Sequence, residues 1–206
     1  MNSLNAETQG AISPSRAIEL LQEGNERYTN GKMVVRNLNL QQEQTSYGQW
    51  PFAAILGCID SRVPAELIFD QGIGDIFNAR VAGNFSNTDI LGSLEYSCKV
   101  AGAKAVIVLG HSSCGAVKGA CDGVELGNIT SMLANLKPAI DSVTDETENR
   151  TSSNDGFVQK VVESNAHLTV ADIRRNSPTL KEMEDSGDII IAAAVYDVAS
   201  GKVDFI

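Results

Sequence analysis

Short apolar runs alternate with longer amphipathic stretches along most of the chain. Continuous apolar runs are typical of strands that a sheet buries on both faces, and they span residues 52–57, 105–110 and 188–195. Weaker strand patterns span residues 75–81 and 203–206. Helical spacing predicts helices over residues 14–30, 88–101, 115–120, 127–143 and 154–175. This alternation predicts an α/β fold: a mainly parallel central β-sheet of four parallel strands plus a short edge strand, flanked by helices.

The first fifty residues differ from the rest of the chain. Ser13 can cap a helix and Pro14 suits its first turn, so the helix over residues 14–30 has a clear start. Residues 31–50 are polar and weakly patterned, which indicates an extended or loosely helical segment. We therefore expect an N-terminal helical arm over residues 1–50 and an α/β region over residues 51–206, forming a single domain overall.

Composition and charge exclude several classes of function. The chain has 206 residues and a formal net charge of -10, which argues against sequence-independent nucleic-acid binding and against binding to anionic membranes. No apolar run approaches the ~20 residues that a membrane-spanning helix needs. Residues 1–10 are polar and lack the apolar centre of a signal peptide, so we expect a cytoplasmic protein. In that compartment the four cysteines favour metal or catalytic chemistry over disulfides.

Chemically active residues follow two of the predicted strands. Cys58, Asp60 and Arg62 come directly after the first buried strand, and His111 and Cys114 follow the strand over residues 105–110. If the first strand continued in an extended form, residues 58, 60 and 62 would share one face. An aspartate beside an arginine forms a bidentate pair that keeps the carboxylate ionised. Because parallel strands place such residues at one edge of a sheet, both groups can meet there.

Two cysteines and one histidine make a suitable ligand set for zinc. Three protein ligands leave the fourth tetrahedral position open, which is typical of a catalytic zinc rather than a structural one. Each fragment alone has a simpler explanation, because a buried cysteine after a strand is usually a small hydrophobic residue and an isolated His-x-x-Cys is weak evidence. Together they favour a metal site, although spacing alone does not identify a reaction.

The motifs also resemble those of a known family. Cys-x-Asp-x-Arg followed about fifty residues later by His-x-x-Cys is the signature of the β-class carbonic anhydrases, and the surrounding residues resemble that family over nearly the whole chain. The matching segments are 57–64, 69–72, 74–75, 80–84, 92–96 and 108–116, together with the N-terminal helix and residues 195–198. The resemblance implies a zinc-dependent enzyme that reversibly hydrates carbon dioxide to bicarbonate and a proton via zinc-bound hydroxide.

The resemblance also implies roles for individual residues. Cys58, His111 and Cys114 would bind one Zn²⁺ per chain. Asp60 would accept a hydrogen bond from the zinc-bound hydroxide, and Arg62 would hold Asp60 in place. The substrate pocket would include Gln49, Phe77, Tyr96 and Gly115.

Two resting forms of the zinc site occur in this family, one open and one closed by the aspartate. Members that close with bicarbonate bound have a tryptophan three residues before the first zinc cysteine, and this chain has Ile55 there. Arg80 and Tyr196 occupy the positions of that bicarbonate site's arginine and tyrosine. Because the tryptophan is missing, we expect an open site with Asp60 bonded to Arg62 near and above neutral pH.

Family members are dimers or larger, so the resemblance implies a homodimer or a homotetramer. The helix over residues 14–30 would reach a partner subunit, and Gln49 with part of the apolar pocket would come from the neighbouring subunit. Hydrolysis of carbon disulfide or carbonyl sulfide on the same scaffold is an alternative, as is a structural zinc protein without turnover. A thiol redox protein is disfavoured because the chain has no Cys-x-x-Cys pair. Cys98, Cys121 and His167 are interpreted as residues without a role in the site.

Overall fold

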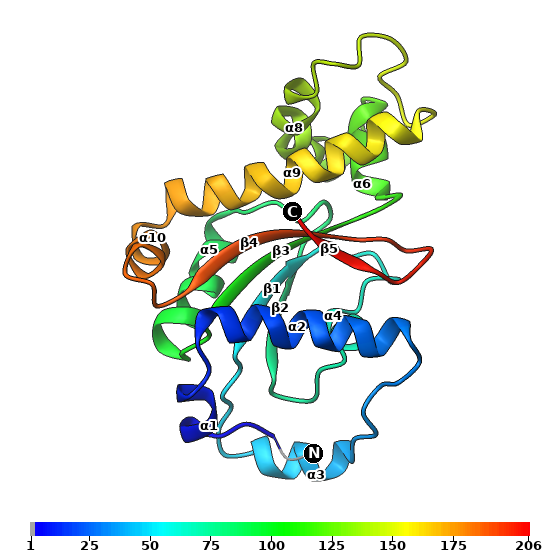
Figure 1. The fold of residues 1–206 in the computed structure, drawn as a ribbon. Helices are drawn as coiled ribbons and strands as arrows, with labels where there is room; N and C mark the ends of the chain where they lie inside the picture. The colour runs from blue at the N-terminus through cyan, green and yellow to red at the C-terminus, as the bar shows by residue number, and fades with distance from the viewer. Residues whose placement is uncertain (1–2) are drawn as a thin grey trace.

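A five-stranded sheet forms the centre of the computed structural model, which describes residues 3–206 (Figure 1). The strands are β1 (Ala53–Gly57), β2 (Ile76–Arg80), β3 (Ala105–His111), β4 (Ile190–Tyr196) and β5 (Val203–Phe205). Their order in the sheet is β2-β1-β3-β4-β5. The first four are parallel, and β5 pairs with β4 in the antiparallel sense. This arrangement confirms the predicted fold class.

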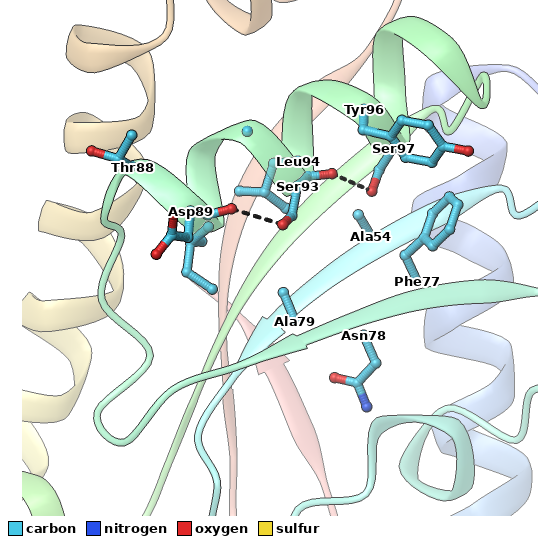
Figure 2. Close-up of a pocket in the computed structure, with 12 residues that line it drawn as sticks. Ala54, Phe77, Asn78, Ala79, Thr88, Asp89, Ser93, Leu94, Tyr96 and Ser97 are labelled. Atoms are coloured by element: carbon cyan, nitrogen blue, oxygen red, sulfur yellow. Dashed lines mark hydrogen bonds between the residues drawn. The ribbon is translucent and has the colours of Figure 1, made fainter.

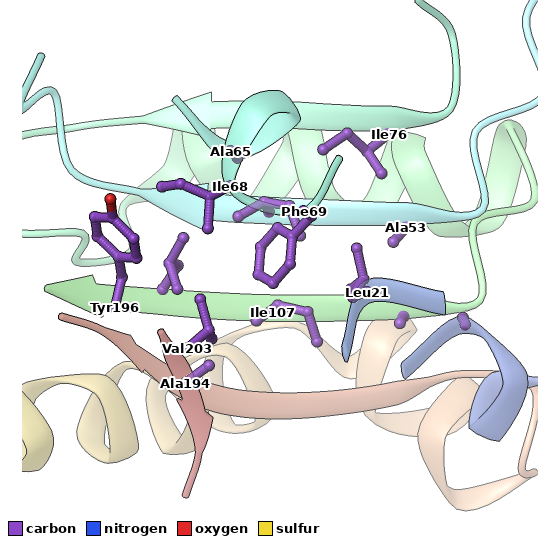
Figure 3. Packing of buried hydrophobic residues seen from close by; sticks show 14 of the residues in the cluster. Leu21, Ala53, Ala65, Ile68, Phe69, Ile76, Ile107, Ala194, Tyr196 and Val203 are labelled. Atoms are coloured by element: carbon purple, nitrogen blue, oxygen red, sulfur yellow. The ribbon is translucent and has the colours of Figure 1, made fainter. Parts of the chain in front are cut away.

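Helices cover both faces of the sheet, as Figure 1 shows. One face packs against α2 (Pro14–Thr29) and the short helix α4 (Ala65–Ile68), and Figure 3 shows Leu21, Ile68 and Phe69 meeting strand residues there. The other face packs against α5 (Thr88–Glu95), α9 (Asp155–Asn176) and α10 (Pro178–Asp185). Burial on both faces explains why β1 and β3 are apolar throughout and read as uninterrupted runs.

The N-terminal region lies against the sheet. It contains α1 (Ala6–Gly10), α2 and α3 (Leu38–Thr45), so part of the segment predicted to be extended or loosely helical is a regular helix. Ser13 caps α2 by accepting a hydrogen bond from the amide of Arg16, and Pro14 occupies the first turn as expected. Leu21 of α2 is fully buried in the chain's own core. That α2 also reaches a partner subunit stays a prediction, and so does the division of the chain at residue 50.

Several helix boundaries differ from the expected ones. The helix predicted over residues 88–101 has the expected ends within one residue, but its second part is the π-helix η1 (Tyr96–Val100), which follows α5 directly. The helix predicted over residues 127–143 is divided into α7 (Gly127–Leu133), the 3-10 turn η2 (Ala134–Leu136) and α8 (Lys137–Ser142). Pro138 lies in the first turn of α8, where its missing N–H costs nothing, whereas it could not continue a helix from the residues before it. The sequence pattern missed α1, α4 and α10.

The carboxyl ends of the parallel strands meet at one edge of the sheet. Beneath this edge a third apolar cluster is formed by residues of α6 (Gly115–Cys121), α7, α8 and α9, and it includes Cys58 and Cys114.

None of the helices within residues 3–206 is long and apolar enough to cross a membrane.

Candidate functional site

Three potential metal ligands converge at the carboxyl edge of the sheet. Cys58 directly follows β1, His111 is the last residue of β3, and Cys114 is the N-cap residue of α6. Because β1 and β3 are neighbouring parallel strands, with Gly57 opposite Leu109, their ends lie side by side. The ligand atoms of the three residues all lie within 4.8 Å of one another, and the three side chains are buried. The structure thus brings together the three residues that the sequence suggested.

The chemistry of these donors fits a metal ion. The Nε2 atom of His111 is buried without a hydrogen-bond partner, while Nδ1 lies 3.0 Å from the carbonyl oxygen of Ser112. Since a carbonyl oxygen only accepts, Nδ1 carries the proton and the lone pair of Nε2 is free to ligate. The hydrogen bond from Cys114 holds the pKa of Cys58 well below its usual range. Its hydrogen bond with Cys58, together with burial, raises the pKa of Cys114. The pair therefore holds a thiolate readily, and thiolates are the metal-binding form.

Asp60 and Arg62 meet through a tight turn. The strand does not continue to residue 62 as the shared-face argument supposed, because β1 ends at Gly57 and the amide of Val63 bonds back to the carbonyl oxygen of Asp60. Arg62 donates from its backbone N–H and its Nε to Asp60 Oδ1, each at 2.9 Å, and from a terminal nitrogen to Oδ2 at 2.8 Å. The expected Asp60–Arg62 pair is therefore present.

This pair keeps a carboxylate next to the cluster. The hydrogen bonds from Arg62 hold the pKa of Asp60 well below its usual range, so the group stays ionised near neutral pH. Its Oδ2 atom lies 4.0 Å from Nε2 of His111. An ionised carboxylate at this distance can accept a hydrogen bond from a donor placed between it and the cluster.

Arg80 stabilises the same turn, a role that the sequence analysis missed. Its Nε donates to the carbonyl oxygen of Cys58 at 2.7 Å, and a terminal nitrogen donates to that of Asp60 at 2.6 Å. Gly83 lies on the other side, and its amide approaches the sulfur of Cys58 at 3.4 Å. The family motif over residues 80–84 includes Arg80 and Gly83, but the motif does not indicate that these residues contact Cys58 and Asp60.

A cavity of about 660 Å³ opens beside the cluster. Four residues assigned from the sequence line it: Cys58, Asp60, Arg62 and Gly115. Its other wall is apolar and includes Val124, Ile129 and Met132, which the sequence analysis did not identify. The helical pattern over residues 127–143 includes Ile129 and Met132 but not Val124, and such a pattern far more often reflects simple packing than a substrate site.

Gln49, Phe77 and Tyr96 do not line this cavity. Phe77 and Tyr96 lie in a different hollow of about 740 Å³ between β2 and α5, where Figure 2 shows them facing each other. Their ring centroids are 6.2 Å apart at an interplanar angle of 73°, an edge-to-face contact. Gln49 is exposed in the loop before β1. Within one chain these three residues and the metal-ligand cluster are therefore separate.

Comparison with known proteins agrees with this geometry. The profile of the family described as carbonic anhydrase matches residues 53–203, which include all three candidate ligands. The chain is 35% identical to carbonic anhydrase 2 of Mycobacterium tuberculosis over 92% of this chain and 91% of that protein. The chain belongs to the β-class carbonic anhydrase family.

Solved β-carbonic anhydrases share the fold of this family member. The structure of the β-carbonic anhydrase CcaA matches 93% of this chain and 90% of that one, with a TM-score of 0.72 and 25% identity. A tetrameric β-carbonic anhydrase from Sordaria macrospora matches 82% of this chain and 90% of that one, with a TM-score of 0.67 and 25% identity. The match to CcaA extends over most of the N-terminal region as well as the sheet, since it covers 93% of the chain.

Proposed function

We propose that this β-class carbonic anhydrase reversibly hydrates carbon dioxide to bicarbonate and a proton, with Zn²⁺ held by Cys58, His111 and Cys114. The observation that carries the proposal is the buried three-donor cluster with the Asp60–Arg62 pair at its side. A structural zinc site needs no ionised carboxylate directed at an open position. A site for a small-molecule reaction gains from such a carboxylate, because it orients the reacting group.

The bound Zn²⁺ would supply Lewis acidity, which lowers the pKa of water to around 7. Asp60 would orient the reacting hydroxyl group by accepting its hydrogen bond, since an ionised carboxylate offers only acceptor positions. Arg62 would keep Asp60 ionised and fix its direction through the hydrogen bonds described above. The apolar wall formed by Val124, Ile129 and Met132 suits a small nonpolar molecule better than an ion.

The substrate site would be completed by self-association into a homodimer or a homotetramer. Gln49, Phe77 and Tyr96 lie outside the cavity of their own chain, so a neighbouring copy would supply them. Tyr96 is 52% exposed, which leaves its ring available to a partner. The tetrameric relative from Sordaria macrospora supports such an assembly. Sedimentation of the protein as a fully active monomer would contradict it.

A cytoplasmic location fits the chemistry of the ligands. Cys58 and Cys114 must stay reduced to bind a metal, and the cytoplasm keeps thiols reduced. Fractionation of the host cell followed by immunodetection would test this placement.

The decisive experiment is a stopped-flow assay of carbon dioxide hydration at pH 7 and pH 8.5, on protein of measured zinc content. We expect rapid hydration at both values with one zinc per chain. Cys58→Ser should lose both zinc and activity. Cys121→Ser is the matched control, because Cys121 lies outside the cluster, and it should keep both.

Asp60→Asn separates metal binding from turnover. The variant should retain zinc and lose hydration, because an amide oxygen accepts more weakly and an amide cannot form the charged bidentate pair with Arg62. A wild-type protein that carries one zinc per chain and hydrates no carbon dioxide would refute the proposed function. Carbonyl sulfide, tested in the same assay, would then show whether the site acts on another linear substrate.

A further inference from the structure

The two-residue turn between His111 and Cys114 is tied to a distant part of the chain. Ser112 donates from its hydroxyl group to Oδ1 of Asp197 at 3.1 Å, although the two residues are 85 positions apart. The amide of Val198 donates to the same hydroxyl oxygen at 3.0 Å. The backbone amide of Ser112 also donates to the carbonyl oxygen of Tyr196 at 2.9 Å. Ser112 is therefore held by hydrogen bonds to Tyr196 at the end of β4 and to Asp197 and Val198 in the turn that follows.

Asp197 is itself fixed within that turn. Its Oδ1 accepts from the amide of Ala199 at 2.9 Å, and its Oδ2 accepts from the hydroxyl of Ser200 at 2.9 Å. Its carbonyl oxygen accepts from the amide of Gly201 at 2.8 Å. One carboxylate thus closes the β4–β5 turn and holds Ser112, so the positions of the two turns depend on the same group.

The position of Ser112 determines the orientation of the His111 ring. The carbonyl oxygen of Ser112 is the acceptor for Nδ1 of His111, and this bond orients the ring with Nε2 toward the two cysteine sulfurs. Ser113, next in the chain, has a backbone φ of 54°, which leaves this short connection little freedom to relax. A shift of Ser112 would therefore change the ring of His111 and the sulfur position of Cys114 together.

We propose that Asp197 is a positioning residue for the metal site, acting through Ser112 on His111 and Cys114. Asp197 contacts neither the three ligand atoms nor the cavity residues; it orients the turn that carries two ligands. This inference rests on the proposed metal site, but it does not depend on which substrate that site converts. Groups behind metal ligands typically change metal affinity or activity by 10- to 100-fold when they are removed.

The test measures metal affinity directly. Metal-free wild-type protein and variants are titrated with Co²⁺ against a competing chelator, and the visible absorption of the Co²⁺ complex reports the ligand geometry. Ser112→Ala and Asp197→Ala should each weaken Co²⁺ binding by about 10- to 100-fold and alter the absorption bands. The double variant should be no weaker than the worse single variant, because both changes remove the same interaction.

Two further variants separate positioning from general stability. Asp197→Asn keeps an oxygen that can accept from Ser112 and from Ala199, so it should bind Co²⁺ with nearly the wild-type affinity. Ser200→Ala removes another contact of Asp197 in the same turn but leaves the bond to Ser112, and it should leave affinity and spectrum unchanged. Thermal unfolding of the metal-free proteins is measured alongside, because a merely structural role would lower the melting temperature without changing the spectrum.

The proposal is overturned if Ser112→Ala and Asp197→Ala bind Co²⁺ with wild-type affinity and spectrum, whatever their melting temperatures. It is also overturned if the wild-type protein shows no thiolate-ligated Co²⁺ bands. If Asp197→Ala does not fold, Ser112→Ala alone decides the question, since it removes only one half-buried hydroxyl group. A wild-type protein that binds Co²⁺ as expected but hydrates no carbon dioxide would refute the proposed function and leave this inference standing.

Discussion

Replacing Gly24 by alanine tests how closely the N-terminal helix approaches the rest of the chain. Gly24 lies within α2, and a Cβ atom at this position would be 1.8 Å from the carbonyl oxygen of Phe69 and 2.7 Å from its carbonyl carbon. Real Cβ contacts are essentially never shorter than 3.0 Å, so the helix would have to move by about 1.2 Å at least. Helix propensity alone predicts the opposite effect, because alanine in a helix is favoured over glycine by roughly 0.5–1 kcal/mol.

The expected loss of folding free energy follows from the contacts that α2 makes with the rest of the chain. Overpacking of a well-packed contact costs about 1–3 kcal/mol. The movement also stretches the hydrogen bonds of Asn25, whose side-chain amide donates to the carbonyl oxygens of Ile68 at 3.1 Å and of Gly201 at 2.8 Å. Each such bond contributes roughly 1 kcal/mol. After subtraction of the helix-propensity gain, we expect a net loss of about 2–4 kcal/mol, or a fall in melting temperature of roughly 5–15 °C for a chain of this size.

Urea denaturation and thermal unfolding of the Gly24→Ala variant measure this loss. Gly92→Ala is the matched control, because Gly92 also lies inside a helix, α5, and a Cβ there would meet nothing within 4 Å. The control should be unchanged or more stable by up to about 1 kcal/mol. If Gly24→Ala proved as stable as the wild type, the close packing of α2 on Phe69 would be wrong.

Two further predictions concern charged groups. Arg62→Ala should keep zinc but reduce carbon dioxide hydration by roughly 10- to 100-fold, because Asp60 loses the partner that orients it; full activity at pH 7 in the stopped-flow assay would contradict this. Asp70 has a fully buried side chain paired with Arg27 and Arg36, whose hydrogen bonds lower its pKa despite burial. Because the folded-state pKa is the lower one, this stabilisation is complete above the unfolded value of about 3.9 and is lost as pH falls through the folded value. Asp70→Asn should therefore be destabilised by about 3–5 kcal/mol near pH 7, and its deficit relative to wild type in urea denaturation should shrink below about pH 4; a deficit independent of pH would refute the assignment.

The parts of the fold that could be predicted from sequence are those decided by local pattern. The strands β1 and β3 were found within one residue of their ends, because every position in them is buried and apolar. The start of α2 was predictable from Ser13 and Pro14, which act through their own backbone positions. The helix α10 begins with the same kind of signal, Ser177 followed by a proline, but its polar surface left no apolar run to draw attention to it.

The candidate ligands were predictable for a different reason. Cys58, His111 and Cys114 each follow a recognisable strand or begin the next helix, so the topology of a parallel sheet was enough to bring them together. Their wider support was not predictable. Arg80 donates to the carbonyl oxygens of Cys58 and Asp60. Every residue type has a backbone carbonyl oxygen, so the sequence does not show which residues accept such bonds.

The site is produced by register more than by any single motif. Residue His111 at the end of β3 lies opposite Tyr196 at the end of β4, and this pairing sets Asp197 beside Ser112. A one-residue slip between the two strands would separate the carboxylate from the hydroxyl and turn the following side chains to the other face. Burial opposes such a slip, because β3 is buried along its whole length and β4 along most of its length, so a slip would displace the core side chains of both strands at once. Core packing and ligand geometry are therefore one constraint here, and substitutions deep in β4 should affect metal affinity as well as stability.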